Sequence, residues 1–152
     1  MTTDAYQPCP CGIDKKIKFC CGAEVLGDLG KIEDALSGEQ RLGALDLCNK
    51  LLAAKNDRPC IHMYKAMVQM GMRELPAARK TVDEILAISP GNPAGLALAA
   101  MLACYEDRVE DGVEKLQQAL EAQQGKLVNS VYEAIGVVGR SLAAAGESIA
   151  AQ

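Results

Sequence analysis

The chain has 152 residues, of which 49% are hydrophobic and 24% are charged, and its formal net charge is −4. These values predict a globular protein of roughly one domain, and the acidic balance argues against nucleic acid as the main partner. Residues 1–8 lack the basic and apolar regions of a signal peptide. The longest apolar run, residues 95–105, is shorter than the ~20 residues that a membrane span needs.

The N-terminal segment concentrates four of the seven cysteines in the spacing C-x-C-x8-C-C. Zinc is held in structural sites by four such ligands at tetrahedral corners, about 2.3 Å from each sulfur. Gly12 permits a sharp reversal after the first pair, and the loop that follows is long enough to return the chain to the metal. Four thiolates leave no open position, so we predict one structural Zn²⁺ bound by Cys9, Cys11, Cys20 and Cys21.

Disulfide bonding and redox chemistry are two other interpretations of this cluster. Disulfides require an oxidising compartment, and a bridge between the neighbours Cys20 and Cys21 is strained. A redox pair normally has the spacing C-x-x-C beside a βαβ pattern, and neither is present. A thiol-based redox or metal-responsive protein that uses the Cys20–Cys21 pair remains the alternative to a structural zinc site.

The stretch CPCGIDKKIKFCCG at residues 9–22 resembles the SEC-C zinc motif, which occurs at the C-terminal end of the SecA preprotein translocase ATPase and in other bacterial proteins. The motif has Ser-Gly where this chain has Ile13 and Asp14. The resemblance implies zinc binding and, in the translocase, docking of a partner chaperone. It makes the lysines of the loop candidate partner-binding residues: Lys15, Lys16 and Lys18.

From residue 24 onward, apolar residues recur at helical spacing and nowhere alternate strictly, which predicts an all-α fold. The expected helices cover residues 25–36, 42 to about 56–59, 60–71, 75–88, 94–106, 109–123 and 127–145. Ser37-Gly38 and residues 89–93 are the clearest breaks.

The same segment contains a repeat with a period of 34 residues. Three small residues early in alternate helices recur at this period: Ala44, Ala78 and Gly112. Three sets of apolar residues are also spaced 34 positions apart. Thirty-four residues is the period of the tetratricopeptide repeat (TPR), and residues 24–152 resemble that family. The resemblance implies a right-handed solenoid of helical hairpins. The expected domains are a zinc knuckle at 1–23 and TPR-like repeats at 24–152.

The sequence predicts that the last repeat is incomplete. Residues 145–147 are typical of a turn, so residues 148–152 would form barely one turn of its second helix. This arrangement would leave Ile135, Val138 and Leu142 uncovered. We therefore expect self-association through the C-terminal helix, or continuation of the chain into further repeats.

Methionines suggest a second candidate surface. On the expected helix 60–71 they form one stripe, next to an apolar stripe of Ile61, Tyr64 and Val68. A methionine-rich groove suits an apolar peptide, and the alternative is that all these side chains belong to the core. The candidates on this surface are Met63, Met67, Met70, Met101 and Tyr105.

No phosphate-binding loop, metalloprotease motif or catalytic triad is recognised, and the single histidine, His62, is expected to be partly exposed on its helix. Cys48, Cys60 and Cys104 are expected to pack as small apolar groups. The sequence thus predicts a cytoplasmic, non-enzymatic adaptor that uses structural zinc and TPR-like repeats for protein–protein interaction.

Overall fold

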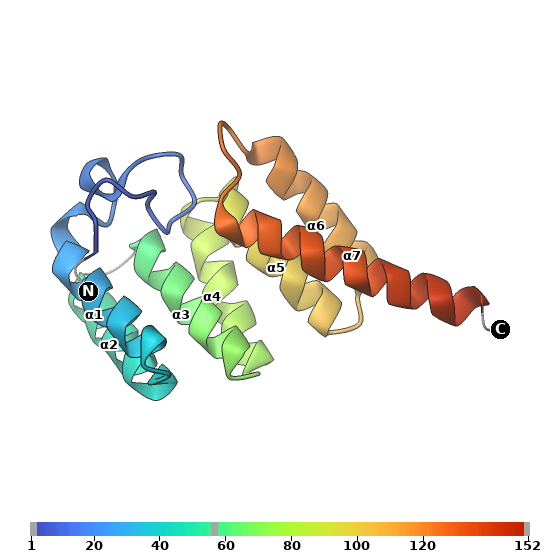
Figure 1. Cartoon of the computed structure of the whole chain (residues 1–152), viewed down its shortest axis with the longest axis horizontal. Coiled ribbons are helices and arrows are strands. Elements are labelled where there is room, and N and C mark those ends of the chain that lie inside the picture. The colour runs from blue at the N-terminus through green and yellow to red at the C-terminus, as the bar shows by residue number, and fades with distance from the viewer. Residues whose placement is uncertain (1–2, 56–57, 151–152) are drawn as a thin grey trace.

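The computed structural model describes residues 3–55 and 58–150 (Figure 1). This part of the chain forms seven α-helices and two short 3₁₀ turns, and it contains no strand. The turns are η1 (Ile17–Phe19) and η2 (Ala23–Val25). The helices are α1 (Leu26–Ser37), α2 (Arg41–Lys55), α3 (Pro59–Gly71), α4 (Leu75–Ile88), α5 (Pro93–Tyr105), α6 (Val109–Ala122) and α7 (Asn129–Ala150). None of the described helices is long and apolar enough to cross a membrane.

The helices pack as consecutive hairpins: α1 on α2, α3 on α4, and α5 on α6. Adjacent hairpins are joined by contacts of α2 with α3 and of α4 with α5, and α7 packs on both α5 and α6. Figure 1 shows the resulting row of antiparallel helices, with the N-terminal loop lying across one end of α1, α3 and α4. The predicted all-α, helical-hairpin fold is confirmed.

The three hairpin turns repeat one backbone geometry at the predicted period. Glu39, Arg73 and Asp107, which are 34 residues apart, have φ of 59°, 63° and 59°. In each turn the next N–H donates to a carbonyl five residues earlier, at 2.8, 2.9 and 2.8 Å. This is the Schellman arrangement that satisfies free carbonyls at a helix end. The repeat is therefore a property of the backbone as well as of the sequence.

Two apolar cores meet at α3. One lies among the N-terminal loop, α1, α2 and one face of α3, and includes Ile61 and Tyr64. The other lies among α3 to α7 and includes Met63 and Met101, which are 2% and 3% exposed. The stripe of Ile61, Tyr64 and Val68 is thus packed, whereas in the methionine stripe Met67 is exposed. Met63 and Met101 are core residues rather than groove residues.

Several expectations need correction. Residues 145–147 form no turn, because α7 runs without interruption to Ala150; a glycine inside a helix disfavours it by only ~1 kcal/mol, which flanking alanines tolerate. Val138 is buried at 2% exposure. His62 is also buried, with Nδ1 3.4 Å from a carboxylate oxygen of Glu84. Two predicted segments fall partly outside the described residues: the end of the second helix, at residues 56–57, and the last turn of the chain, at residues 151–152.

Candidate metal centre

The N-terminal loop folds back on itself and so brings its two cysteine pairs together. The Cys9 N–H donates to the carbonyl of Lys15 at 2.8 Å, and the Gly12 N–H donates to the carbonyl of Cys9 at 3.3 Å. Gly12 has φ of 82°, which a residue with a side chain seldom adopts. An isolated antiparallel bridge joins Pro8 to Lys16, and η1 then returns the chain to the second pair.

The four sulfur atoms form a compact set. All four Sγ atoms lie within 4.8 Å of one another. The Cys9–Cys21 distance is 3.8 Å and the Cys11–Cys20 distance is 3.3 Å. Four sulfurs bound at ~2.3 Å to one tetrahedral zinc ion would be separated by ~3.8 Å. The donor set therefore fits a four-coordinate metal ion with only small adjustments.

The thiols of the cluster share their protons through hydrogen bonds. Contacts with Cys11, Cys21 and Cys60 lower the pKa of the Cys9 thiol far below its usual range. Hydrogen bonds with Cys11 and Cys60 lower the pKa of Cys21 to about 7. Burial raises the pKa of Cys20 to about 11. A bound metal ion would replace these shared protons, because a coordinating thiol is deprotonated.

A fifth thiol, Cys60, adjoins the cluster. It lies in the first turn of α3 and is fully buried in the core that also contains the four clustered cysteines, and its interactions with Cys21 and Cys9 raise the pKa of its thiol. The sequence predicted only a small packing residue there, and no local signal distinguishes this cysteine from Cys48 or Cys104. Its contact with the cluster arises from the docking of the loop on the first turn of α3.

Two polar side chains from the helices fasten the loop. Arg58, just before α3, donates from Nη1 to the carbonyl of Cys21 at 2.6 Å and pairs with Glu24. Asn92 caps α5 by accepting from the Gly95 N–H at 2.9 Å, and its amide group donates to the carbonyl of Cys11, 81 positions away. Asn92 is 1% exposed. The cysteine cluster is thus attached to the starts of α3 and α5.

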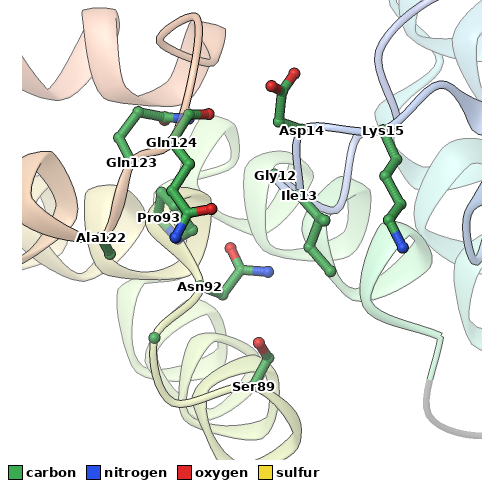
Figure 2. A pocket seen from close by; sticks show the side chains of 11 residues that line it. Gly12, Ile13, Asp14, Lys15, Ser89, Asn92, Pro93, Ala122, Gln123 and Gln124 are labelled. Atoms are coloured by element: carbon green, nitrogen blue, oxygen red, sulfur yellow. The ribbon is translucent and has the colours of Figure 1, made fainter.

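A cleft of about 360 Å³ lies beside this attachment (Figure 2). The loop around Ile13 and Asp14 forms one side, the α4–α5 turn forms the floor, and Gln123 and Gln124 at the end of α6 form the other side. The side chain of Asp14 contacts Gly125, because a Cβ added to Gly125 would lie 2.3 Å from a carboxylate oxygen of Asp14. Both positions that depart from the SEC-C motif therefore face the helical repeats.

Residues 28–102 match the family model of the tetratricopeptide repeat. The match covers most of α1, all of α2 to α4, and most of α5. The cysteine cluster lies outside it, and the SEC-C resemblance has no family match of its own. No curated protein and no solved structure matches the chain. Proteins with TPR repeats generally use them to bind other proteins.

The partner-binding candidates fall into two groups. The lysines of the loop are all exposed, and the Nζ atoms of Lys16 and Lys18 lie 5.4 and 5.0 Å from the centre of the Tyr6 ring. Lys18 also lies 5.7 Å from the ring of Phe19, which is 65% exposed. These four residues form one basic and aromatic surface, here called the knuckle surface, and Lys15 is exposed on the cleft side of the same loop.

The apolar candidates do not come together as a groove. Met67 is 42% exposed and Met70 is half-buried against the core. Tyr105 is 41% exposed, and the guanidinium group of Arg73 lies 5.8 Å from its ring centre. With Met63 and Met101 in the core, no continuous methionine surface forms among the described residues.

Proposed function

We propose that this chain is a non-enzymatic adaptor in which a structural zinc site, made by Cys9, Cys11, Cys20 and Cys21, is attached to TPR-like repeats that bind other proteins. The observation that carries the proposal is the set of four Sγ atoms within 4.8 Å of one another. The Cys9–Cys21 and Cys11–Cys20 separations, 3.8 and 3.3 Å, are near the ~3.8 Å edge of a tetrahedral zinc–thiolate site. Zinc sites of this closed type are structural.

The loop has few large apolar side chains of its own to hold it folded. Among residues 3–22 of the loop, Ile17 is the only fully buried large apolar side chain, whereas Ile13 and Phe19 are 42% and 65% exposed. Small segments of this kind usually depend on metal for their fold. The metal would therefore supply cross-linking and no chemistry, and the residues of the loop would present the knuckle surface in a fixed orientation.

The knuckle surface suggests the type of partner. Lysine ammonium groups next to exposed aromatic rings favour an acidic segment that also carries apolar side chains. A cytoplasmic location fits such an adaptor, because thiols remain reduced there and can hold zinc.

Elemental analysis of protein purified without added metal tests the metal assignment. We expect one zinc per chain in the wild type and none in Cys11→Ala. The matched control is Cys104→Ala, which removes a buried thiol outside the cluster and should retain one zinc. Iron in place of zinc, or no metal in the wild type, would contradict the proposal.

The partner surface is tested by reversing charges in the protein and measuring how tightly each variant binds a fluorescent acidic peptide that contains aromatic residues. The double variant Lys16→Glu/Lys18→Glu should weaken peptide binding at least about tenfold, which corresponds to ~1.4 kcal/mol. The control Lys50→Glu/Lys80→Glu makes the same change in net charge at two exposed lysines of α2 and α4, outside the knuckle. Equal loss in both variants would show that only overall charge matters.

A redox or metal-responsive function is the second candidate. It is favoured by the half-buried Cys21, whose pKa is lowered to about 7 by hydrogen bonds from Cys11 and Cys60. A thiolate of that kind reacts readily with electrophiles. If Cys21 reacts with iodoacetamide in zinc-loaded protein as fast as in chelated protein, this alternative replaces the structural role.

A further inference from the structure

Arg58 connects the cysteine cluster to the start of α3. Its Nη1 donates to the backbone carbonyl of Cys21 at 2.6 Å, and its Nη2 pairs with the carboxylate of Glu24. The Arg58 side chain is only 19% exposed, whereas the Glu24 side chain is 70% exposed. A guanidinium group is always charged and carries five N–H donors in a fixed plane. A largely buried positive charge is therefore bonded directly to one of the clustered cysteines.

One donor of this guanidinium group lacks an acceptor. The Nε atom of Arg58 is buried and makes no hydrogen bond with any described residue. Buried donors without a partner are uncommon in folded proteins, so each one needs an explanation. Ionised sulfur accepts hydrogen bonds, and bonds between charged groups are stronger than those between neutral groups. The anionic form of the cluster would therefore suit this guanidinium group better than the neutral thiols do.

The metal-loaded cluster would carry a net negative charge. Four thiolates outweigh the two positive charges of Zn²⁺ and leave a formal charge of −2. Cys9 and Cys11 are buried, and a buried charge is costly unless an opposite charge compensates it. The lysines of the loop are exposed, so water and salt screen them. Arg58 is largely buried, and its charge is screened less.

The start of α3 adds to this positive charge. Arg58 is the residue before α3, and no described side chain caps this end of the helix. Cys60, in the first turn, lies in the core that also contains the four clustered cysteines. The N-terminus of a helix carries a partial positive charge that favours nearby anions. Arg58 and the start of α3 thus both favour the anionic form of the cluster.

We propose that Arg58 is a positioning residue of the metal site, which fixes the backbone of Cys21 and compensates the negative charge of the thiolates, and so raises the affinity for zinc. This inference rests on the zinc site proposed above. It distinguishes Arg58 from Asn92, which donates to the carbonyl of Cys11 but carries no charge. Asn92 fastens the loop, whereas Arg58 also determines how tightly the loop holds zinc.

Competition between the whole chain and a chromogenic chelator measures the dissociation constant for zinc. Loss of a group that supports a metal ligand typically weakens metal binding about 10–100-fold, and Arg58→Met should raise the constant by about that factor. Arg58→Lys keeps the charge but loses the planar fork, so it should raise the constant less. Arg41→Met is the matched control, because Arg41 also donates to a backbone carbonyl, that of Gly71. It should leave the constant unchanged.

Glu24→Gln separates compensation of charge from simple fastening. This change breaks the ion pair with Arg58 and leaves the guanidinium charge uncompensated. If Arg58 only fastened the loop, loss of the ion pair would weaken zinc binding. Compensation of charge predicts instead a dissociation constant equal to or below that of the wild type.

Thermal unfolding with and without zinc gives a second readout. By mass action, a variant that binds zinc more weakly loses stability mainly in the loaded protein. Arg58→Met should therefore lower the melting temperature of the zinc-loaded chain more than that of the metal-free chain. An equal fall in both forms, an unchanged dissociation constant in Arg58→Met, or a raised one in Glu24→Gln would overturn the inference and leave the zinc site in place. A wild type that binds no zinc would overturn both.

Discussion

Asn92 joins the knuckle to the repeats, and Asn92→Ala tests how much this contact stabilises the protein. The side chain makes two hydrogen bonds from a position that is 1% exposed. Loss of the helix cap destabilises a protein by about 1 kcal/mol. A buried carbonyl at Cys11 left without its donor adds about 1–3 kcal/mol. We therefore expect Asn92→Ala to lower the free energy of unfolding by about 2–4 kcal/mol.

Asn92→Asp separates the two contributions. A carboxylate still accepts from the Gly95 N–H and suits a helix N-terminus. It cannot donate to the Cys11 carbonyl, and its charge lies close to the thiolates. We expect Asn92→Asp to lose about 1–3 kcal/mol even though the cap is retained. Asn49→Ala, at an exposed position of α2, is the control and should be nearly neutral.

Thermal unfolding of the zinc-loaded proteins, followed by far-ultraviolet circular dichroism, measures these effects. For a chain of this size each kcal/mol corresponds to about 2–4 °C, so Asn92→Ala should melt about 5–15 °C below the wild type. A midpoint for Asn92→Ala within about 2 °C of the wild type would refute the reasoning. An Asn92→Asp variant as stable as the wild type would show that the bond to Cys11 contributes nothing.

Three further predictions follow from individual contacts. Gly12→Ala should lower the melting temperature, because φ is 82° and the new Cβ would lie 2.4 Å from the nearest side-chain atom; Gly27→Ala, which meets no atom within 4 Å, should be neutral or stabilising by up to ~1 kcal/mol. Cys60→Ala should retain one zinc but release it faster to a chromogenic chelator, since the buried thiol that packs beside the ligand cysteines is lost; an unchanged rate would remove Cys60 from the site. Burial, together with the hydrogen bond to Glu33, raises the pKa of Tyr64 above its ordinary value of 10.0. The stability that Tyr64 provides is therefore complete below about pH 10 and is lost as the pH rises above it, so urea unfolding of Tyr64→Phe should depend less on pH in that range than unfolding of the wild type.

The fold was largely predictable because its signals are local. Helix 75–88 was predicted with the observed bounds, since a proline in its first turn and the break at residues 89–93 mark both ends. The repeat period was also visible in the small residues of alternate helices. The shared turn geometry was not visible, because Glu39, Arg73 and Asp107 have no side-chain chemistry in common.

The C-terminal helix shows where local signals fail. The sequence around Gly146 predicts a turn, yet α7 continues through it, because a single glycine weakens a helix without ending it. The site shows a different limit. The spacing of the four cysteines predicted the cluster, but the contacts of Asn92 and Cys60 with the loop join residues far apart in the chain. The division into domains at residue 23 stays a prediction, although the loop shares a core with α1, α2 and α3.

Chelation tests how far that shared core makes the two parts interdependent. Removal of zinc should unfold the loop and lower the melting temperature, while most of the helical signal persists at low temperature, because the larger core lies among α3 to α7. Loss of most of the helical circular dichroism signal on chelation would contradict this expectation.

X-ray absorption at the zinc edge of the purified protein tests the central claim most directly. The account predicts one zinc per chain with four sulfur neighbours at ~2.3 Å and no nitrogen or oxygen in the coordination shell. Fewer than four sulfur neighbours, a nitrogen or oxygen ligand, or protein that binds no zinc would contradict it.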